Sequence, residues 1–435
     1  MNIKLSKVHQ GLSGKLSFPG DKSLSHRAII FGSLAEGESH FTNVLNAEDC
    51  VYTRKAFEAM GVDISVPSPG ELRIKGKGPH SLKNPLHDIY LGNSGTSMRL
   101  LMGILAGCPL ETTLTGDASL SLRPMRRVTD FLKQMGASFE GRDNANFAPI
   151  KVRGTQLKGI RADLPIASAQ VKSAILLAGL YAEGITSVTE PLKSRDHTER
   201  FLKYFGASIE EKGLTVSIAG GQKLKGQSFE IAGDISSAAF FMAMTLLVPG
   251  SRIEFRSILA NPTRSGMVEV LKRAGVRLGS LERGTSGGPE PVSNFFLNSQ
   301  PMKSFEIKKE ELPALIDEIP ILAVLATQAN GTSVIHDAHE LRVKETDRIH
   351  SMVSQLSKMG AKIKAEGDTL IIEGPTTLHG EKVESFKDHR TAMSLIVAGL
   401  IAEGETEVRD LDCINTSFPN FFQLLKKVGV PLCVE

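Results

Sequence analysis

The chain has 435 residues, more than one hydrophobic core normally supports, so two or more domains are expected. Its 41% apolar and 23% charged residues are ordinary for a soluble globular protein, and a net charge of +3 gives no global field that would attract nucleic acid or a membrane surface. The longest apolar run, 238–249, is far shorter than the ~20 residues of a membrane span, and four scattered cysteines without a CxxC pair argue against a zinc site or a disulfide framework. Because the N-terminus also lacks the apolar stretch of a signal peptide, we expect a soluble, cytoplasmic protein.

Six apolar segments rich in Ala and Gly recur along the chain, and each is closed by a glycine. They span 28–37, 100–107, 174–184, 238–250, 321–331 and 395–404. Helices that are apolar on every face are buried, so these segments predict buried helices. Runs typical of β-strands follow several of them, such as ITSV at 185–188 and ETEV at 405–408.

A second pattern alternates with the first and consists of an amphipathic segment that ends in Gly. Its copies span 57–64, 131–139, 201–209, 271–278, 356–363 and 424–430. Glycine directly after a helix and before a strand is typical of a helix C-terminus. Both patterns repeat at intervals of about 70 residues, which predicts six copies of one α/β unit, three in each of two domains.

The segments just before the buried helices are polar and carry the functional signal. They read PGDKSLSHR, LGNSGTSMR, SAQVKSA, GDISS, IDEIP and KDHR, in chain order. Capping of the helix N-terminus is sufficient to account for Asp234, Ser236 and Ser237.

Capping does not account for Lys22, Arg27 and Arg390. A cation at the positive end of a helix is unfavourable by ~0.3–1 kcal/mol, and a bound anion would reverse that penalty. If several of these helix starts converge, they form a site for a multiply anionic ligand. Arg123 in SLRPM fits such a site, and the charged segment 340–350 is either part of it or a solvated helix face.

The motifs PGDKSLSHRA, LGNSGTSMRLL, RPM, SAQVKSA, RVKETDR and DHR, in this order, resemble those of 5-enolpyruvylshikimate-3-phosphate synthases over the whole chain. The alternative within the same chemistry is the UDP-N-acetylglucosamine enolpyruvyl transferase, which typically carries a reactive cysteine where this chain has Ala118. A further alternative is a non-catalytic anion-binding scaffold. Asp317 and Glu345 argue against it, because a pure anion trap has no need for them.

The resemblance implies an α/β fold with two similar domains, 21–233 and 1–20 plus 234–435. Each would contain three βαβαββ units with buried parallel helices and outer mixed sheets, an inside-out α/β barrel, with the ligand cleft between the domains. It also implies a monomer without cofactor or metal, whose partners are the small molecules shikimate 3-phosphate and phosphoenolpyruvate.

The resemblance also implies a role for individual residues. The residues expected to bind shikimate 3-phosphate are Lys22, Ser23, Arg27, Ser168, Gln170, Ser194, Asp317 and Lys344. Those expected to bind phosphoenolpyruvate are Lys22, Gly95, Arg123, Gln170, Arg348 and Arg390, with Asn93 and Thr96 shaping the loop.

The expected catalytic groups are Asp317, Glu345 and Lys22. Asp317 would be the base at the 5-hydroxyl of shikimate 3-phosphate, with Lys22 close by. Glu345 would protonate the methylene carbon of phosphoenolpyruvate. Whether either carboxyl can serve depends on burial and neighbouring cations, which the sequence leaves open.

Four positions depart from the usual family pattern: Leu100, Ala169, Glu340 and Thr416. A lysine is common at the last of these, so its absence puts one phosphate contact in doubt. The segments SRDHTE, SAQVK and NPTR resemble the subgroup known for herbicide tolerance, so we expect reduced sensitivity to glyphosate.

Overall fold

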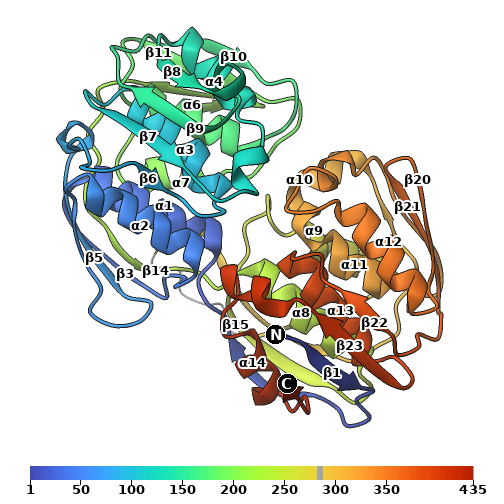
Figure 1. The fold of residues 1–435 in the computed structure, drawn as a ribbon. Helices are drawn as coiled ribbons and strands as arrows, with labels where there is room; N and C mark the ends of the chain where they lie inside the picture. The colour runs from blue at the N-terminus through green and yellow to red at the C-terminus, as the bar shows by residue number, and fades with distance from the viewer. Residues whose placement is uncertain (282–287, 435) are drawn as a thin grey trace. The chain divides into compact units, whose positions relative to one another are not determined.

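The computed structural model describes residues 1–281 and 288–434 as a mixed α/β protein. The described residues form two compact units. Unit 1 comprises those within Met1–Pro19, Ala232–Thr285 and Pro291–Glu435, and unit 2 those within Gly20–Ile231 and Ser286–Glu290. In each unit, helices pack against small mixed sheets (Figure 1).

Three four-stranded sheets cover unit 2. Their strands, in order across each sheet, are β14 (Ser228–Glu230), β3 (Glu36–Thr42), β5 (Leu72–Lys77) and β4 (Asp63–Ser65); β6 (Ile89–Tyr90), β7 (Glu111–Thr115), β9 (Phe147–Arg153) and β8 (Ser138–Gly141); and β10 (Arg161–Asp163), β11 (Ile185–Thr189), β13 (Thr215–Ala219) and β12 (Ile209–Lys212).

Three further sheets cover unit 1. Their strands are β16 (Gly279–Ser280), β17 (Val292–Asn298), β15 (Arg252–Leu259) and β2 (Ser13–Ser17); β18 (Glu306–Ile307), β19 (Gly331–Ile335), β21 (Thr369–Gly374) and β20 (Lys362–Glu366); and β22 (Lys382–Glu384), β23 (Glu405–Arg409), β1 (Ile3–Ser6) and β24 (Cys433–Val434). The N-terminal strands β1 and β2 thus complete two sheets built mainly from the second half of the chain.

All six sheets within the described residues share one pairing pattern, a parallel pair followed by two antiparallel pairs. The repetition supports the repeated α/β unit predicted from the sequence.

The six predicted buried helices are confirmed. They are α1 (Lys22–Leu34), α3 (Gly95–Ala106), α6 (Ala169–Gly179), α8 (Ile235–Leu247), α11 (Ile319–Ala326) and α13 (His389–Gly399). α3 packs against α6 so closely that a Cβ atom at Gly103 would lie 2.2 Å from the Ala174 carbonyl oxygen. In unit 1, α8, α11 and α13 pack against one another.

The second pattern also forms helices, which keep a polar face exposed. They are α2 (Glu48–Ala59), α4 (Arg126–Gln134), α7 (His197–Tyr204), α9 (Gly266–Arg273), α12 (Arg348–Lys358) and α14 (Phe421–Lys427). The glycine after each of them has φ between 84° and 101°, the left-handed conformation expected after a helix C-terminus. The short helices α5 (Arg142–Ala145) and α10 (Leu312–Leu315) and six 3₁₀ turns complete the described helices; the turns are η1 (Pro79–Ser81), η2 (Leu120–Leu122), η3 (Lys309–Glu311), η4 (Ile316–Glu318), η5 (His339–Leu341) and η6 (Leu411–Thr416).

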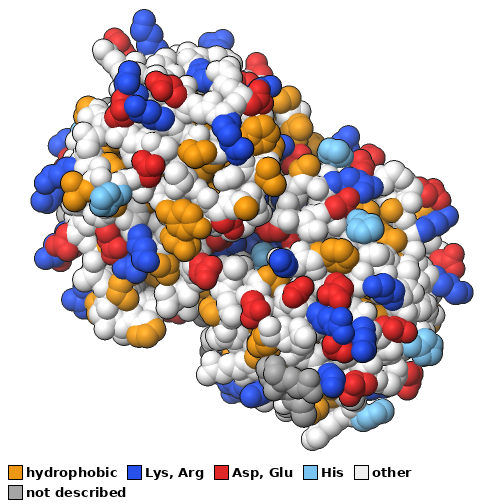
Figure 2. Space-filling view, viewed as in Figure 1, with side chains coloured by type: hydrophobic (Ala, Val, Ile, Leu, Met, Phe, Trp, Pro, Cys, Tyr) orange, Lys and Arg blue, Asp and Glu red, His pale blue; other side chains and the backbone are white. Residues whose placement is uncertain are grey.

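The surface carries basic and acidic side chains interspersed on the face shown in Figure 2. No helix within residues 1–281 and 288–434 has the length and apolar character needed to cross a bilayer. Cys50, Cys108 and Cys413 carry free thiols.

Candidate active site

The first three buried helices bring their N-terminal ends together in unit 2, and each has a side-chain cap. Asp21 caps α1 by accepting a hydrogen bond from the Leu24 N–H, and Ser94 and Ser168 cap α3 and α6 in the same way. These side chains satisfy N–H groups in the first turn of each helix.

Hydroxyl groups connect the N-terminal half of α1 to α2 and α3. His26 Nδ1 lies 2.8 Å from Thr53 Oγ1, which lies 2.6 Å from Ser97 Oγ on α3. Burial lowers the pKa of His26 to about 4, outweighing the opposing charge of Asp49, so the ring is neutral at neutral pH. This contact orients the start of α1 without adding charge.

Arg27, expected at the shikimate 3-phosphate site, is buried. Its Nε donates to Thr198 Oγ1 and its Nη2 to Ser173 Oγ, each at 2.8 Å, and its Nη1 donates to the Ser23 carbonyl at 3.1 Å. Burial lowers the pKa of Arg27 to about 10, against the opposing effect of Glu199, so the guanidinium stays charged. The side chain thus joins α1 to α6 and α7.

Lys22 and Ser23 lie in the first turn of α1 and are partly accessible. The Lys22 ammonium lies 2.8 Å from Asp49 Oδ2 on α2, so a carboxylate balances its charge. Lys22 has one quarter of its side chain exposed and remains available to an anion at the helix start.

Around the start of α3, a cluster of polar groups includes four residues predicted for the phosphoenolpyruvate site or its loop. Arg123 donates to the side-chain and main-chain oxygens of Asn93, the latter at 3.3 Å. Gln170 Nε2 donates to Thr96 Oγ1 at 2.9 Å, and Gln170 Oε1 accepts from Arg99 Nη1 at 2.6 Å. α3, α6 and the loop carrying Arg123 are therefore joined at one place.

Gly95 lies at the centre of this cluster. A Cβ atom there would be 3.0 Å from Arg99 Nη1 and 3.4 Å from Arg123 Nη1. Glycine therefore places no side chain between the helix N-terminus and the two guanidinium groups. Arg99 was not among the predicted ligands, although it is the last residue of the motif LGNSGTSMR.

Ser194, predicted near the shikimate 3-phosphate phosphate group, is buried. Its hydroxyl donates to Glu190 Oε1, and its N–H donates to Glu190 Oε2 at 3.3 Å. Glu190 in turn pairs with Lys172 at 2.7 Å, and Lys172 also lies 2.7 Å from Glu199. Burial lowers the pKa of Lys172, but the two carboxylates outweigh this and leave it raised.

In unit 1, the other three buried helices bring their starts together around Asp317, the central residue of η4. Arg348 Nη1 lies 3.4 Å and Arg390 Nε 3.8 Å from Asp317 Oδ1. Arg390 Nη1 also donates to the Asp317 carbonyl at 2.9 Å. Two predicted phosphoenolpyruvate ligands therefore contact the predicted base.

Arg348 connects three carboxylates and is itself almost completely buried. Its Nε lies 2.9 Å from Asp388 Oδ2, and its Nη2 lies 2.7 Å from Glu345 Oε2, in addition to the contact with Asp317. Burial alone would lower the pKa of Arg348, but Asp388, Glu345 and Asp317 overcome this and raise it. The two predicted catalytic carboxyls thus share one guanidinium.

Lys344 lies between Arg342 and Glu345 in the charged segment and is partly accessible. Arg342 pairs with Asp347 at 2.8 Å and Asp368 at 2.6 Å, which fixes the segment before α12. The segment is not one solvated helix face, because α12 begins only at Arg348.

Sequence reasoning missed three charged residues beside Asp317. Arg264 Nη1 lies 3.8 Å from Asp317 Oδ2, Glu318 Oε1 lies 3.7 Å from Arg390 Nη1, and Asp388 both caps α13 and pairs with Arg348. Of the three residues expected to cap α8, only Asp234 does so, because the Ser236 hydroxyl donates to Glu318 and accepts from Arg264. Asp234 accepts from the Ser236 N–H at 2.8 Å and from the Ser237 hydroxyl at 3.2 Å.

The departures from the usual pattern fall at four different places. Thr416 donates its hydroxyl to the Cys413 carbonyl at 2.7 Å within η6, and Leu100 is fully buried in α3. Glu340 lies in η5, and Ala169 begins α6. Thr416 therefore supplies no cation where a lysine is common.

Among the described residues, one cluster has donor atoms close enough for a metal ion: Asp196, His197 and Glu290, all buried. His197 Nδ1 lies 2.7 Å from Glu290 Oε1. Arg200 Nε lies 2.9 Å from Asp196 Oδ1 and 3.7 Å from Glu290 Oε2. A guanidinium thus already supplies positive charge to this cluster.

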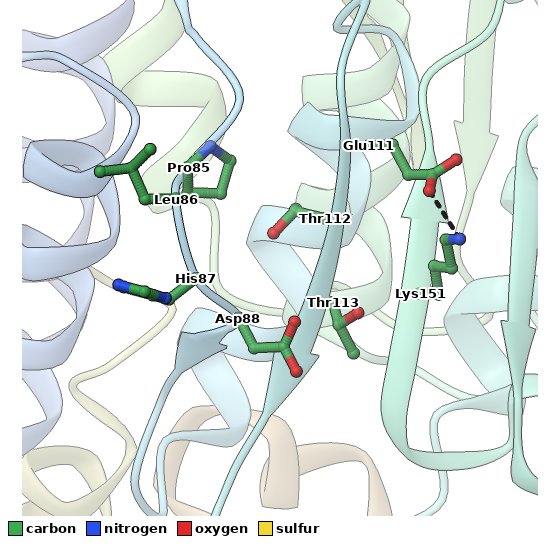
Figure 3. A pocket seen from close by; sticks show the side chains of 8 residues that line it. All are labelled: Pro85, Leu86, His87, Asp88, Glu111, Thr112, Thr113 and Lys151. Carbon is green, nitrogen blue, oxygen red and sulfur yellow. Dashed lines mark ion pairs between the residues drawn. The ribbon is translucent and has the colours of Figure 1, made fainter.

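A surface pocket of about 250 Å³ lies elsewhere on unit 2 (Figure 3). The segment 85–88, β7 and Lys151 of β9 line it, and Glu111 and Lys151 form an ion pair of 2.6 Å at one side. It contains none of the residues predicted to bind substrate, so the helix starts, and not this pocket, define the candidate site.

Known proteins match this chain over almost its full length. The sequence profile of EPSP synthase (3-phosphoshikimate 1-carboxyvinyltransferase) matches residues 7–425. The 3-phosphoshikimate 1-carboxyvinyltransferases of Bacillus thuringiensis (strain Al Hakam) and Bacillus anthracis are each 47% identical to this chain. The alignments cover 98% of this chain and 98% and 99% of the relatives. The chain belongs to the EPSP synthase family.

The structure is also similar to that of a solved EPSP synthase. The structure of EPSP synthase from Acinetobacter baumannii matches with a TM-score of 0.91 at 43% identity, covering 100% of this chain and 99% of that one. The family predicted from the six motifs is confirmed. The ligand assigned to each residue stays a prediction.

Proposed function

We propose that the helix starts of units 1 and 2 bind the two anionic substrates of the EPSP synthase reaction. The chain has 3-phosphoshikimate 1-carboxyvinyltransferase activity in the shikimate pathway, which supplies aromatic amino acid biosynthesis. This reaction transfers the enolpyruvyl group of phosphoenolpyruvate to the 5-hydroxyl of shikimate 3-phosphate and releases phosphate. Both substrates are anions, and helix N-termini with adjacent cations favour anions.

Shikimate 3-phosphate is assigned to residues near the starts of α1, α6 and α7, together with Asp317 and Lys344 of unit 1. The set is Lys22, Ser23, Arg27, Ser168, Gln170, Ser194, Asp317 and Lys344. Arg27 and Ser194 are buried and bonded within unit 2, so they support the site chiefly by orienting the groups around them.

Phosphoenolpyruvate is assigned to Lys22, Gly95, Arg123, Gln170, Arg348 and Arg390. The cluster of Arg99, Arg123 and Gln170 around Gly95 supports this assignment in unit 2. Arg348 and Arg390 come from unit 1, so the two domains, proposed as 21–233 and 1–20 plus 234–435, must both reach the same substrates.

The proposed chemistry proceeds through a tetrahedral intermediate. Asp317 takes the proton of the 5-hydroxyl as its oxygen attacks C2 of phosphoenolpyruvate, and Glu345, which must be protonated when the substrates are bound, delivers its proton to C3. In the second step the C–O bond to phosphate breaks, Glu345 regains a proton from the methyl group, and the proton on Asp317 leaves with phosphate. Lys22 and the guanidinium groups stabilise the charge that develops.

The observation that carries this proposal is the Asp317 carboxylate among three guanidinium groups, those of Arg264, Arg348 and Arg390. These cations favour the ionised carboxylate, the form that a general base requires. The same guanidinium groups would also stabilise a substrate anion bound beside Asp317.

The test is a phosphate-release assay with both substrates, with each one omitted, and with UDP-N-acetylglucosamine in place of shikimate 3-phosphate. Asp317→Asn should lower turnover by ~10²–10⁴ and change shikimate 3-phosphate affinity much less. Asp412→Asn, at an exposed carboxylate of unit 1, is the matched control and should behave like the wild type. Wild-type turnover in Asp317→Asn would show that this residue is not the base.

A further inference from the structure

Arg264 belongs to neither predicted substrate set, yet its guanidinium is buried beside the proposed base. It lies in the loop between β15 and α9 and is 3% exposed. Its Nη1 lies 3.8 Å from Asp317 Oδ2, and its Nη2 donates to Ser236 Oγ at 2.8 Å and lies 3.5 Å from Asp234 Oδ1. Burying a charged arginine is costly unless it is paired, so these contacts must offset that cost.

The backbone around Arg264 is fixed by Asn261, which is fully buried. Asn261 Oδ1 accepts from both the N–H and the hydroxyl of Thr263 at 2.8 Å, and the Arg264 N–H donates to the Asn261 carbonyl at 2.9 Å. The Ser236 hydroxyl, which accepts from Arg264, donates to Glu318, the neighbour of Asp317. The guanidinium therefore has little freedom to move away from the Asp317 carboxylate.

The three cations around Asp317 divide between its two oxygens. Arg348 and Arg390 lie near Oδ1, and both are assigned to phosphoenolpyruvate. Arg264 lies near Oδ2 and has no assigned ligand. It can therefore keep the carboxylate ionised and oriented while the other two bind the substrate anion.

We infer that Arg264 is a positioning residue that orients Asp317 and keeps it ionised for proton transfer. The inference rests on the proposed role of Asp317 as the base. It requires no contact between Arg264 and substrate, and it assigns a function to the NPTR segment, which the sequence marks only as a subgroup feature.

The charges that face Asp317 determine the expected pH dependence. The cations are Arg264, Arg348 and Arg390, and the neighbouring carboxylates are Glu318, Asp234 across Arg264, and Glu345 and Asp388 across Arg348. Loss of one cation at this distance disfavours the ionised base. The acid limb of the kcat–pH profile should therefore move upward by about 1 pH unit or more.

The experiment compares kcat–pH profiles of Arg264→Gln and Arg264→Lys with the wild type. In Arg264→Gln, kcat should fall roughly 10- to 100-fold and the acid limb should move upward. Arg264→Lys retains the charge but not the planar fork, so kcat should fall while the acid limb stays in place. Arg273→Gln removes an exposed arginine of the same unit, paired with Glu311, and is the matched control.

Ser236→Ala keeps every charge and covers the case in which Arg264→Gln does not fold. It removes the hydroxyl that accepts from Arg264, so kcat should fall with the acid limb unmoved. An unchanged profile in Arg264→Gln, equal shifts in the glutamine and lysine variants, or an unchanged kcat in Ser236→Ala would overturn the inference. Wild-type turnover in Asp317→Asn would instead overturn the proposed base.

Discussion

Lys172 is a buried cation of α6 that pairs with Glu190, the hydrogen-bond partner of Ser194, and its replacement by methionine should destabilise unit 2. Its ammonium and the carboxylates of Glu190 and Glu199 are each no more than 1% exposed. Methionine fills a similar volume but removes the charge, so both carboxylates lose their cation. Glu190 also accepts the hydroxyl and N–H of Ser194, so the change should reach the site as well.

The expected cost follows from the burial of the two carboxylates. Removing one partner of a buried ion pair typically costs ~3–5 kcal/mol. For a unit of roughly 200 residues this lowers the thermal midpoint by roughly 6–20 °C. Burial already raises the pKa of Glu199 despite the opposing effect of Lys172, so without the lysine that pKa should rise further. A glutamate whose pKa is raised on folding makes the folded protein less stable as pH rises. The loss of stability in Lys172→Met should therefore be larger at pH 8 than at pH 5.

The assay is differential scanning calorimetry of wild type and Lys172→Met at pH 8 and pH 5. Lys193→Met is the matched control, because Lys193 pairs with Glu211 at 3.2 Å and is 35% exposed, so its loss should cost less than about 1 kcal/mol. A midpoint for Lys172→Met within the range of that control, at both pH values, would refute the assigned role of Lys172.

Three further predictions concern the site and the units. Gly95→Ala should raise the KM for phosphoenolpyruvate and weaken glyphosate inhibition, because the added Cβ would lie 3.0 Å from Arg99 Nη1 and 3.4 Å from Arg123 Nη1; unchanged kinetics and inhibition would contradict this. Because burial lowers the pKa of His26 to about 4, the neutral ring stabilises the fold at neutral pH and this contribution is lost as pH falls from about 6.5 toward 4. Urea unfolding of the wild type should therefore lose about 2 kcal/mol more between pH 7 and pH 5 than His26→Gln loses, and equal losses would contradict the assignment. Small-angle scattering should show a smaller radius of gyration with shikimate 3-phosphate plus an unreactive phosphoenolpyruvate analogue, and no contraction at saturation would count against domain closure.

The sequence predicts the repeating elements well because both helix types leave a local signal. An all-apolar segment closed by glycine reports burial directly, and the glycines after the exposed helices take the left-handed conformation that their positions require. The sheets were less accessible to sequence reasoning. β1 and β2 pair with β23 and β15, hundreds of residues away, and such pairings leave no periodic pattern in the chain.

Site residues could be predicted where a motif carries a charge that helix capping does not explain. They were harder to predict where contacts between distant elements determine which residues come together. Lys22, Arg27 and Arg390 stand out because capping does not explain them. Arg264 does not stand out, because a lone arginine in a loop is usually solvated, and only the fold places it beside Asp317. The buried partners of such residues depend on distances between elements that no local pattern encodes.

Phosphoenolpyruvate is proposed to bind to helix starts from both units. The most direct measurement is the KM for phosphoenolpyruvate in Arg123→Ala, from unit 2, and Arg390→Ala, from unit 1. Each loss of charge-assisted contacts should cost ~1.5–3 kcal/mol, a rise in KM of roughly 10- to 150-fold, with little change in the KM for shikimate 3-phosphate. A selective rise in both variants is the predicted result. An unchanged KM for phosphoenolpyruvate in either variant, or equal losses for both substrates, would contradict the account.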